Sequence, residues 1–183
     1  MCENERMCVF HAVVRFCETE AETIVALKNT LMTGKLESSG YRLDFGGPYS
    51  NMWGGCPATV VPHTGKRVWG AIWEIENSYI SDLDRQEGVH QNIYFPIEVC
   101  IETPRGSKVI CRSYQLCTTP EALGNQEILP KERQPSEVYM AVIIKGAIES
   151  ALPSAYIEEL KHIPNNGNKG TMETPVSFPR EFS

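Results

Sequence analysis

The sequence predicts a single α+β domain in which a mainly antiparallel, mixed sheet forms a small β-barrel with helices around it. Short apolar runs rich in β-branched and aromatic residues are typical of strands, and three occur in succession at 41–45, 58–61 and 67–75. Two more, 94–103 and 108–116, flank a Pro-Arg-Gly-Ser segment whose composition is that of a turn, so they predict a hairpin. Because helical patterns surround this block of strands, the order favours an α+β domain.

The remaining elements follow from local signals. Thr19 and Glu22 have the spacing of a capping box, and the apolar residues after them recur at helical intervals. The nearly continuous apolar run from Arg67 predicts a central strand buried on both faces. Residues 118–134 are polar and interrupted by proline, which indicates a long loop. Further elements are expected as a strand at 7–16 and helices at 19–32, 77–87, 136–152 and 153–160.

Length and composition indicate one compact domain. The chain has 183 residues, 42% of them hydrophobic, which is enough to bury a core. We expect this domain to cover residues 1–163. Beyond Pro164 the sequence offers Asn, Gly, Thr and Pro with little to bury, so we expect a flexible tail over residues 164–183.

Charge and cysteine usage exclude several classes of function. A net charge of −6 argues against nucleic acid or an anionic membrane surface as the main partner. No run approaches the roughly 18 apolar residues that span a bilayer, and the acidic N-terminus does not have the pattern of a signal peptide. Seven scattered cysteines and four isolated histidines give no zinc spacing, so we expect reduced thiols in the cytoplasm, no metal and no cofactor.

Glu87 is the candidate catalytic residue. It ends the predicted helix that Asn77 caps, and Gly88 follows as the C′ residue. A carboxylate there meets the negative end of the helix dipole, with Asp82 and Asp84 nearby. Both effects oppose ionisation and predict a raised pKa, which suits a proton acceptor near neutral pH. The alternative is an ordinary solvated surface glutamate.

Eight short motifs occur in an order and spacing that resemble the animal type of γ-glutamylcyclotransferase over residues 41–164. They are Tyr41-Arg-Leu-Asp-Phe-Gly46, Trp53-Gly-Gly, Ala58-Thr59, Val68-Trp-Gly-Ala-Ile-Trp73, Leu83-Asp-Arg-Gln-Glu-Gly-Val89, Tyr94, Cys111-Arg-Ser-Tyr114 and Lys145-Gly-Ala147.

The resemblance implies an enzyme of glutathione metabolism, a lyase that releases an amine from a γ-glutamyl amide. The substrate's α-amine attacks its own γ-carbonyl, which gives 5-oxoproline and a free amino acid. Glu87 matches the family's general acid/base, while Tyr139 and Tyr94 match tyrosines at the substrate pocket. Packing in the core is the alternative for Tyr139, and packing in the sheet is the favoured alternative for Tyr94. The resemblance also implies a homodimer, to which residues 138–144 offer an apolar surface unless they belong to the core.

The first segment departs from the family. Members open with a strand ending in Tyr-Gly-Ser-Asn-Leu, whose backbone N–H groups face the substrate's carboxylate and reacting carbonyl, and residues 1–35 contain no such motif. We interpret residues 1–35 as an atypical segment from an alternative exon or a faulty gene model. We therefore expect much weaker activity than in a member with the loop. Two alternatives stay open: an inactive relative that serves as a binding or dimerisation module, and a cyclotransferase acting on γ-glutamyl amines or glutathione.

Overall fold

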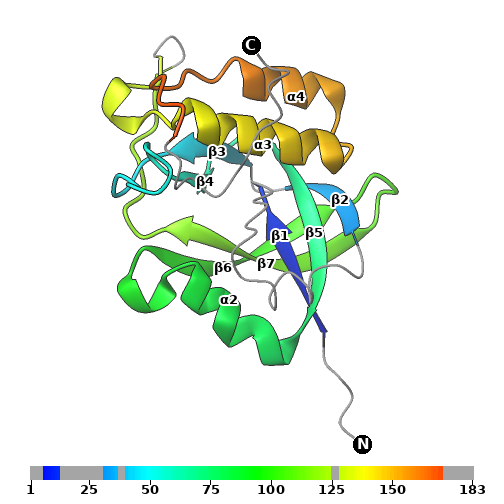
Figure 1. Ribbon diagram of the computed structural model, residues 1–183. Helices are drawn as coiled ribbons and strands as arrows, with labels where there is room; N and C mark the ends of the chain where they lie inside the picture. The colour runs from blue at the N-terminus through cyan, green and yellow to red at the C-terminus, as the bar shows by residue number, and fades with distance from the viewer. Residues whose placement is uncertain (1–5, 13–30, 37–39, 125–127, 171–183) are drawn as a thin grey trace, which may run out of the picture.

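The computed structural model describes residues 6–12, 31–36, 40–124 and 128–170 (Figure 1). Their elements, in chain order, are β1 (Arg6–His11), β2 (Leu31–Leu36), β3 (Tyr41–Phe45), β4 (Ala58–Pro62), β5 (Val68–Glu76), the 3-10 turn η1 (Asn77–Tyr79), α2 (Ile80–Gln86), the 3-10 turn η2 (Val89–Gln91), β6 (Tyr94–Glu102), β7 (Lys108–Leu116), the 3-10 turn η3 (Lys131–Arg133), α3 (Glu137–Glu149) and α4 (Ser154–Lys161).

Five strands form the barrel in the order β1-β5-β2-β6-β7. The neighbours along this order are antiparallel, and β1 meets β7 in parallel at one residue pair, Val9 and Arg112, which closes the ring. Strands β3 and β4 form a separate two-stranded antiparallel sheet. The predicted α+β fold with a mixed, mainly antiparallel barrel is therefore confirmed.

The hairpin β6–β7 is the longest pairing in the barrel and was predicted from its turn. It runs from Tyr94 opposite Leu116 to Glu102 opposite Lys108. The Thr103 N–H donates to the Ser107 carbonyl over 2.8 Å, and Gly106 takes a φ of +80° that a residue with a Cβ adopts only under strain. The register brings the pocket-facing ends of both strands, at Tyr94 and Tyr114, to the same end of the barrel.

Three apolar clusters connect the barrel, the β3–β4 sheet and the helices. One fills the barrel around Phe10, Ile72 and Ile101, and a second joins α3 and α4 to the loops of the β3–β4 sheet. The third lies beneath α2, where Leu83 packs among residues of β1, β5, β6 and β7. Figure 1 shows α3 and α4 on the side of the β3–β4 sheet and α2 on the opposite side of the barrel.

Of two predicted elements near the N-terminus, one needs correction and the other is confirmed in part. The predicted helix 19–32 ends in a strand, because Leu31 and Met32 open β2 and pair with Trp73 and Ile72 of β5. Pairing with a central strand outweighs the local helical spacing there, and residues 19–30 lie outside the described residues. The predicted strand 7–16 is confirmed as β1 as far as His11, while residues 13–16 lie outside the described residues.

The described part of the predicted tail contacts the domain. Asn166 donates from its side chain to the Gly54 carbonyl over 2.8 Å and from its backbone to the Pro135 carbonyl over 2.9 Å. The Val138 N–H donates to the carbonyl of Asn168. Residues 164–170 thus lie against the domain, while residues 171–183 lie outside the described residues, and the flexible tail over residues 164–183 stays a prediction.

The apolar stretch 138–144 of α3 belongs mainly to the core. Val138, Tyr139, Met140, Val142 and Ile143 are all buried within the chain. This stretch therefore does not supply the contact surface that a homodimer was expected to use. Within the described ranges, no helix has both the length and the apolar character needed to cross a bilayer.

Candidate active site

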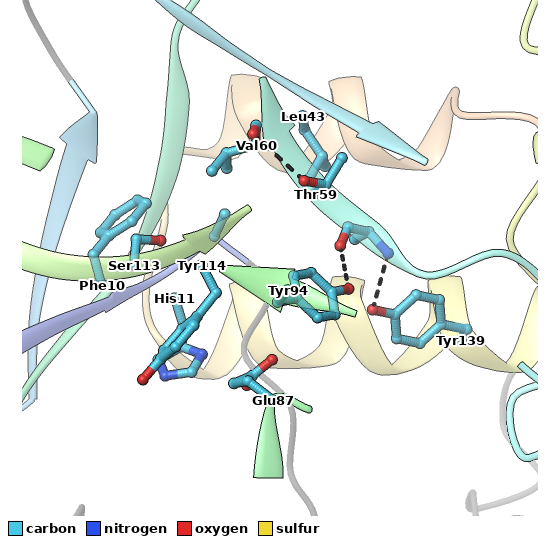
Figure 2. A pocket seen from close by; sticks show the side chains of 12 residues that line it. Phe10, His11, Leu43, Thr59, Val60, Glu87, Tyr94, Ser113, Tyr114 and Tyr139 are labelled. Atoms are coloured by element: carbon cyan, nitrogen blue, oxygen red, sulfur yellow. Dashed lines mark hydrogen bonds between the residues drawn. The ribbon is translucent and has the colours of Figure 1, made fainter. Parts of the chain in front are cut away.

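A single pocket brings together the three residues that the sequence singled out, Glu87, Tyr94 and Tyr139 (Figure 2). The pocket is open on one side, and the space between its walls, counted together with the adjoining solvent, is about 420 Å³. The lining residues come from five strands, α3 and the end of α2: Phe10, His11, Ala12, Leu43, Ala58, Thr59, Val60, Glu87, Tyr94, Ser113, Tyr114 and Tyr139.

Glu87 is placed by the way α2 ends. The helix stops at Gln86, and the Glu87 N–H still donates to the Leu83 carbonyl over 2.9 Å. Gly88 then adopts the left-handed conformation, with a φ of +70°, which turns the chain away from the helix axis. The predicted C′ glycine is thus confirmed, and it leaves the Glu87 side chain half-buried at the pocket wall.

The start of this helix differs from the prediction. Asn77 does not cap an α-helix: it opens the 3-10 turn η1, and α2 begins three residues later at Ile80. Neither η1 nor α2 has a side-chain hydrogen bond from its N-cap residue. The strand β5 continues as far as Glu76, so the chain changes direction between strand and helix within η1.

The Glu87 carboxylate has no hydrogen bond or ion pair with any residue in the described part of the chain. Its two oxygens can therefore accept protons from a ligand without first breaking an internal contact. The same described residues hold no group of three His, Cys, Asp or Glu side chains that could bind a metal ion. A half-buried carboxylate beside tyrosine hydroxyls is suited to moving a proton.

The two tyrosines are both core residues and pocket residues. The Tyr94 hydroxyl donates to the Ala58 carbonyl over 2.7 Å, and the Ala58 N–H donates to the Tyr139 oxygen over 3.4 Å. Tyr139 is 1% exposed and packs on Trp53, with ring centroids 5.1 Å apart. Because Tyr139 only accepts in this arrangement, its own hydroxyl hydrogen can donate to a ligand.

Three linked side chains lie beside Glu87. Arg112 of β7 donates from Nη2 to both carboxylate oxygens of Asp84, each over 2.7 Å, and the Tyr114 hydroxyl donates to the same carboxylate over 2.6 Å. Burial lowers the pKa of Arg112, but the hydrogen bonds to Asp84 and Tyr114 outweigh it and raise the pKa overall. Burial, and then the bond to Asp84, raise the pKa of Tyr114, so this hydroxyl stays protonated.

Sequence reasoning did not identify all the polar residues of the pocket. Thr59, Ser113 and Tyr114 lie inside motifs that were noted only as part of a resemblance, and alternation along β7 does not distinguish pocket from core. His11 was missed because β1 reaches the pocket through its pairing with β5 and its contact with β7, two strands that are distant in the sequence. Among the described residues that line this pocket, His11 is the one whose side chain can carry a positive charge.

Comparison with known proteins places these features in a family. The model of the AIG2-like family matches residues 67–160, just over half of the chain. The chain is 39% identical over 139 residues to gamma-glutamylcyclotransferase of Bos taurus, a match covering 74% of this chain and 68% of the bovine protein. It is 37% identical over 139 residues to gamma-glutamylcyclotransferase of Homo sapiens, with the same shares covered.

The fold agrees with a solved structure of the same kind. A structure described as gamma-glutamyl cyclotransferase superposes with a TM-score of 0.73 at 31% sequence identity. The match covers 91% of this chain and 93% of the solved one. The likeness thus extends beyond the residues that the family model matches.

Proposed function

This chain belongs to the AIG2-like family, and we propose that it is a γ-glutamylcyclotransferase that converts γ-glutamyl amino acids into 5-oxoproline and a free amino acid. The observation that carries the assignment of roles is the position of Glu87. Its half-buried carboxylate, which has no partner among the described residues, lines the same pocket as Tyr94 and Tyr139. The chain is similar to named cyclotransferases over most of its length.

The reaction needs no nucleophile from the protein. The pocket holds the γ-glutamyl group folded, so that its α-amino nitrogen lies against its own γ-carbonyl carbon. Glu87 takes a proton from the α-ammonium group, and the freed nitrogen attacks the carbonyl to form the C–N bond of the five-membered ring. The protonated Glu87 then gives its proton to the departing nitrogen as the original amide C–N bond breaks. The ring nitrogen loses its second proton to the released amine, which leaves as an ammonium group. Tyr139 donates a hydrogen bond to the substrate, while Tyr94 holds Ala58 in place.

Replacing Glu87 tests this assignment directly. We expect Glu87→Gln to lower the release of 5-oxoproline from a γ-glutamyl dipeptide by at least about 10²-fold, because general acid–base catalysis contributes about 10²–10⁴. Asp82→Asn is the matched control, since Asp82 is an exposed carboxylate on the same helix whose partner is Arg85. Equal rates for wild type and Glu87→Gln would refute the role of Glu87. Assaying glutathione and a γ-glutamyl amine alongside the dipeptide identifies the substrate class.

The end of β1 supports the expectation of reduced activity. Where related enzymes are expected to present a glycine-bearing loop, this chain presents His11 and Ala12 at the pocket. A missing backbone donor to the reacting carbonyl typically costs about 10²–10³ in rate. The same observation favours the alternative of an impaired member that binds γ-glutamyl ligands. Binding of a γ-glutamyl dipeptide without release of 5-oxoproline from the wild-type chain would identify that case.

The cellular compartment and the oligomeric state are also part of the proposal. All five cysteines in the described residues are free thiols, which is consistent with a reducing, cytoplasmic environment. A homodimer is also proposed, through a surface other than the buried stretch of α3. Sedimentation of the purified protein tests the second point, and a monomer at micromolar concentration would contradict it.

A further inference from the structure

The helix that carries Glu87 is short and has one apolar anchor. α2 has seven residues, and Leu83 is the only one of them that is buried. An isolated helix of this length is not stable in water, so contacts with the barrel must hold it in place. Any group that fixes its last turn therefore also fixes the position of Glu87.

Asp84 supplies a polar anchor in that last turn. Its carboxylate accepts two hydrogen bonds from Arg112 and one from the hydroxyl of Tyr114. Arg112 also donates from Nε to the Tyr114 oxygen over 3.1 Å, and its guanidinium lies 5.5 Å from the centre of the Tyr114 ring. The three side chains thus contact one another, and two residues of β7, Arg112 and Tyr114, bind the helix through Asp84.

Two neighbouring carboxylates, those of Asp84 and Glu87, differ in whether they have a charged partner. Asp84 and Glu87 are three residues apart, and Glu87 retains helical φ and ψ, so both lie on the same face of the helix. Arg112 neutralises Asp84, whose side chain is 28% exposed, whereas Glu87 has no charged partner in the described residues. One carboxylate is therefore held to the barrel wall, and the other is left for the ligand.

The same set of contacts forms part of the pocket. Tyr114 is 7% exposed and lines the pocket with its side chain, as Figure 2 shows. It also packs with Leu83 in the cluster beneath α2. A shift of α2 would therefore move the pocket wall and the Glu87 carboxylate together.

We infer that Asp84, Arg112 and Tyr114 are positioning residues that hold the Glu87 carboxylate at reacting distance from the γ-glutamyl group. This inference rests on the proposed function for its catalytic consequence. None of the three transfers a proton to the substrate: Asp84 and Arg112 act on Glu87 through the backbone of the last helical turn. A displacement of about 1 Å at a reacting group can cost about 10²-fold in rate.

The test compares two carboxylates on one helix. We expect Asp84→Asn to lower kcat by roughly 10²-fold and to leave KM within about twofold, because positioning of the base affects the chemical step more than binding. Asp82→Asn should leave both constants within about twofold, since it removes only an exposed ion pair with Arg85. Tyr114→Phe, which removes a single hydroxyl, provides a milder variant if Asp84→Asn does not fold, and it should lower kcat with an unchanged KM.

Two further measurements exclude a merely structural role. The double variant Asp84→Asn/Glu87→Gln should turn over no more slowly than Glu87→Gln alone, because Asp84 acts only through Glu87. In crystal structures the Glu87 carboxylate should leave the pocket in Asp84→Asn and keep its place in Asp82→Asn. An active wild type with an unchanged kcat in Asp84→Asn would overturn the inference alone. A wild type without turnover, but with Glu87 displaced in Asp84→Asn, would overturn the proposed function alone.

Discussion

Ala58 links the two tyrosines of the pocket through its own backbone. Its carbonyl accepts a short hydrogen bond of 2.7 Å from Tyr94, whereas its N–H reaches the Tyr139 oxygen over 3.4 Å. All three residues are buried. Because a buried carbonyl that loses its donor remains unsatisfied, the shorter bond contributes more to stability. The longer bond leaves the hydroxyl hydrogen of Tyr139 for a ligand.

This difference predicts that Tyr94→Phe mainly affects stability and that Tyr139→Phe mainly affects substrate binding. Tyr94→Phe should lower the free energy of unfolding by about 1–3 kcal/mol, and Tyr139→Phe by about 0.5 kcal/mol. Tyr139→Phe should instead raise KM for a γ-glutamyl dipeptide, because it removes a donor to the substrate. Urea denaturation and steady-state kinetics measure the two effects. Equal losses of stability, with an unchanged KM in Tyr139→Phe, would contradict this division of roles.

At the scale of the element, Gly88 determines how α2 ends. Its φ of +70° lies in the left-handed region, and a Cβ at this position would approach the Ile93 Cδ1 atom to 2.9 Å. The helix thus ends at a residue for which both conformation and space favour glycine. Glu87 is the residue immediately before this turn, so the direction of its side chain depends on the turn.

Gly88→Ala should therefore impair both stability and activity. The left-handed conformation alone costs an L-residue about 1–2 kcal/mol, and the contact with Ile93 adds to that cost. Gly106→Ala is the matched control, because Gly106 also has a positive φ, of +80°, but no atom lies within 4 Å of its Cβ position. We expect the control to lose stability with kcat unchanged, and Gly88→Ala to lose more stability and also kcat. Equal kcat values in the two variants would show that the turn does not direct Glu87.

At the scale of the whole molecule, barrel closure decides what the pocket contains. β1 pairs with β5 over six residues, from Arg6 opposite Glu76 to His11 opposite Ala71, and meets β7 at Val9. The end of β1 therefore lies at the pocket whichever residues it carries. In this chain it carries His11 and Ala12, where the family resemblance implies a glycine-bearing loop.

A chimera tests the consequence for activity. Replacing residues 1–35 with a first segment that ends in Tyr-Gly-Ser-Asn-Leu should raise kcat/KM by about 10²–10³, because that loop is expected to add backbone donors at the reacting carbonyl. A second chimera, in which the glycine of that loop is changed to a bulkier residue, should lose the gain. Release of 5-oxoproline is the measurement. Equal rates for the original chain and the first chimera would show that His11 and Ala12 serve as well as the loop.

The strands and helices from residue 41 onward could be predicted because their signals are local. The hairpin 94–116 follows from alternating apolar residues around a turn, and α3 follows from its apolar spacing and from Ser136, whose side chain caps the helix by accepting from the Tyr139 N–H over 3.1 Å. Motif order likewise identified Glu87, Tyr94 and Tyr139 as candidates before any geometry was known. Residues 31–36 could not be assigned, because their strand forms by pairing with β5 and β6.

The amino-acid sequence by itself determined the α+β class, the barrel strands after residue 58 and the acidic residue on which the proposed chemistry depends. Only the tertiary structure decided how that residue is held, because Asp84 and Arg112 lie 28 positions apart and meet across the packing of α2 on β7. It also decided that the end of β1 faces the pocket. Propensity and spacing act between neighbours along the chain, whereas a pocket is defined by contacts between strands that are distant in sequence.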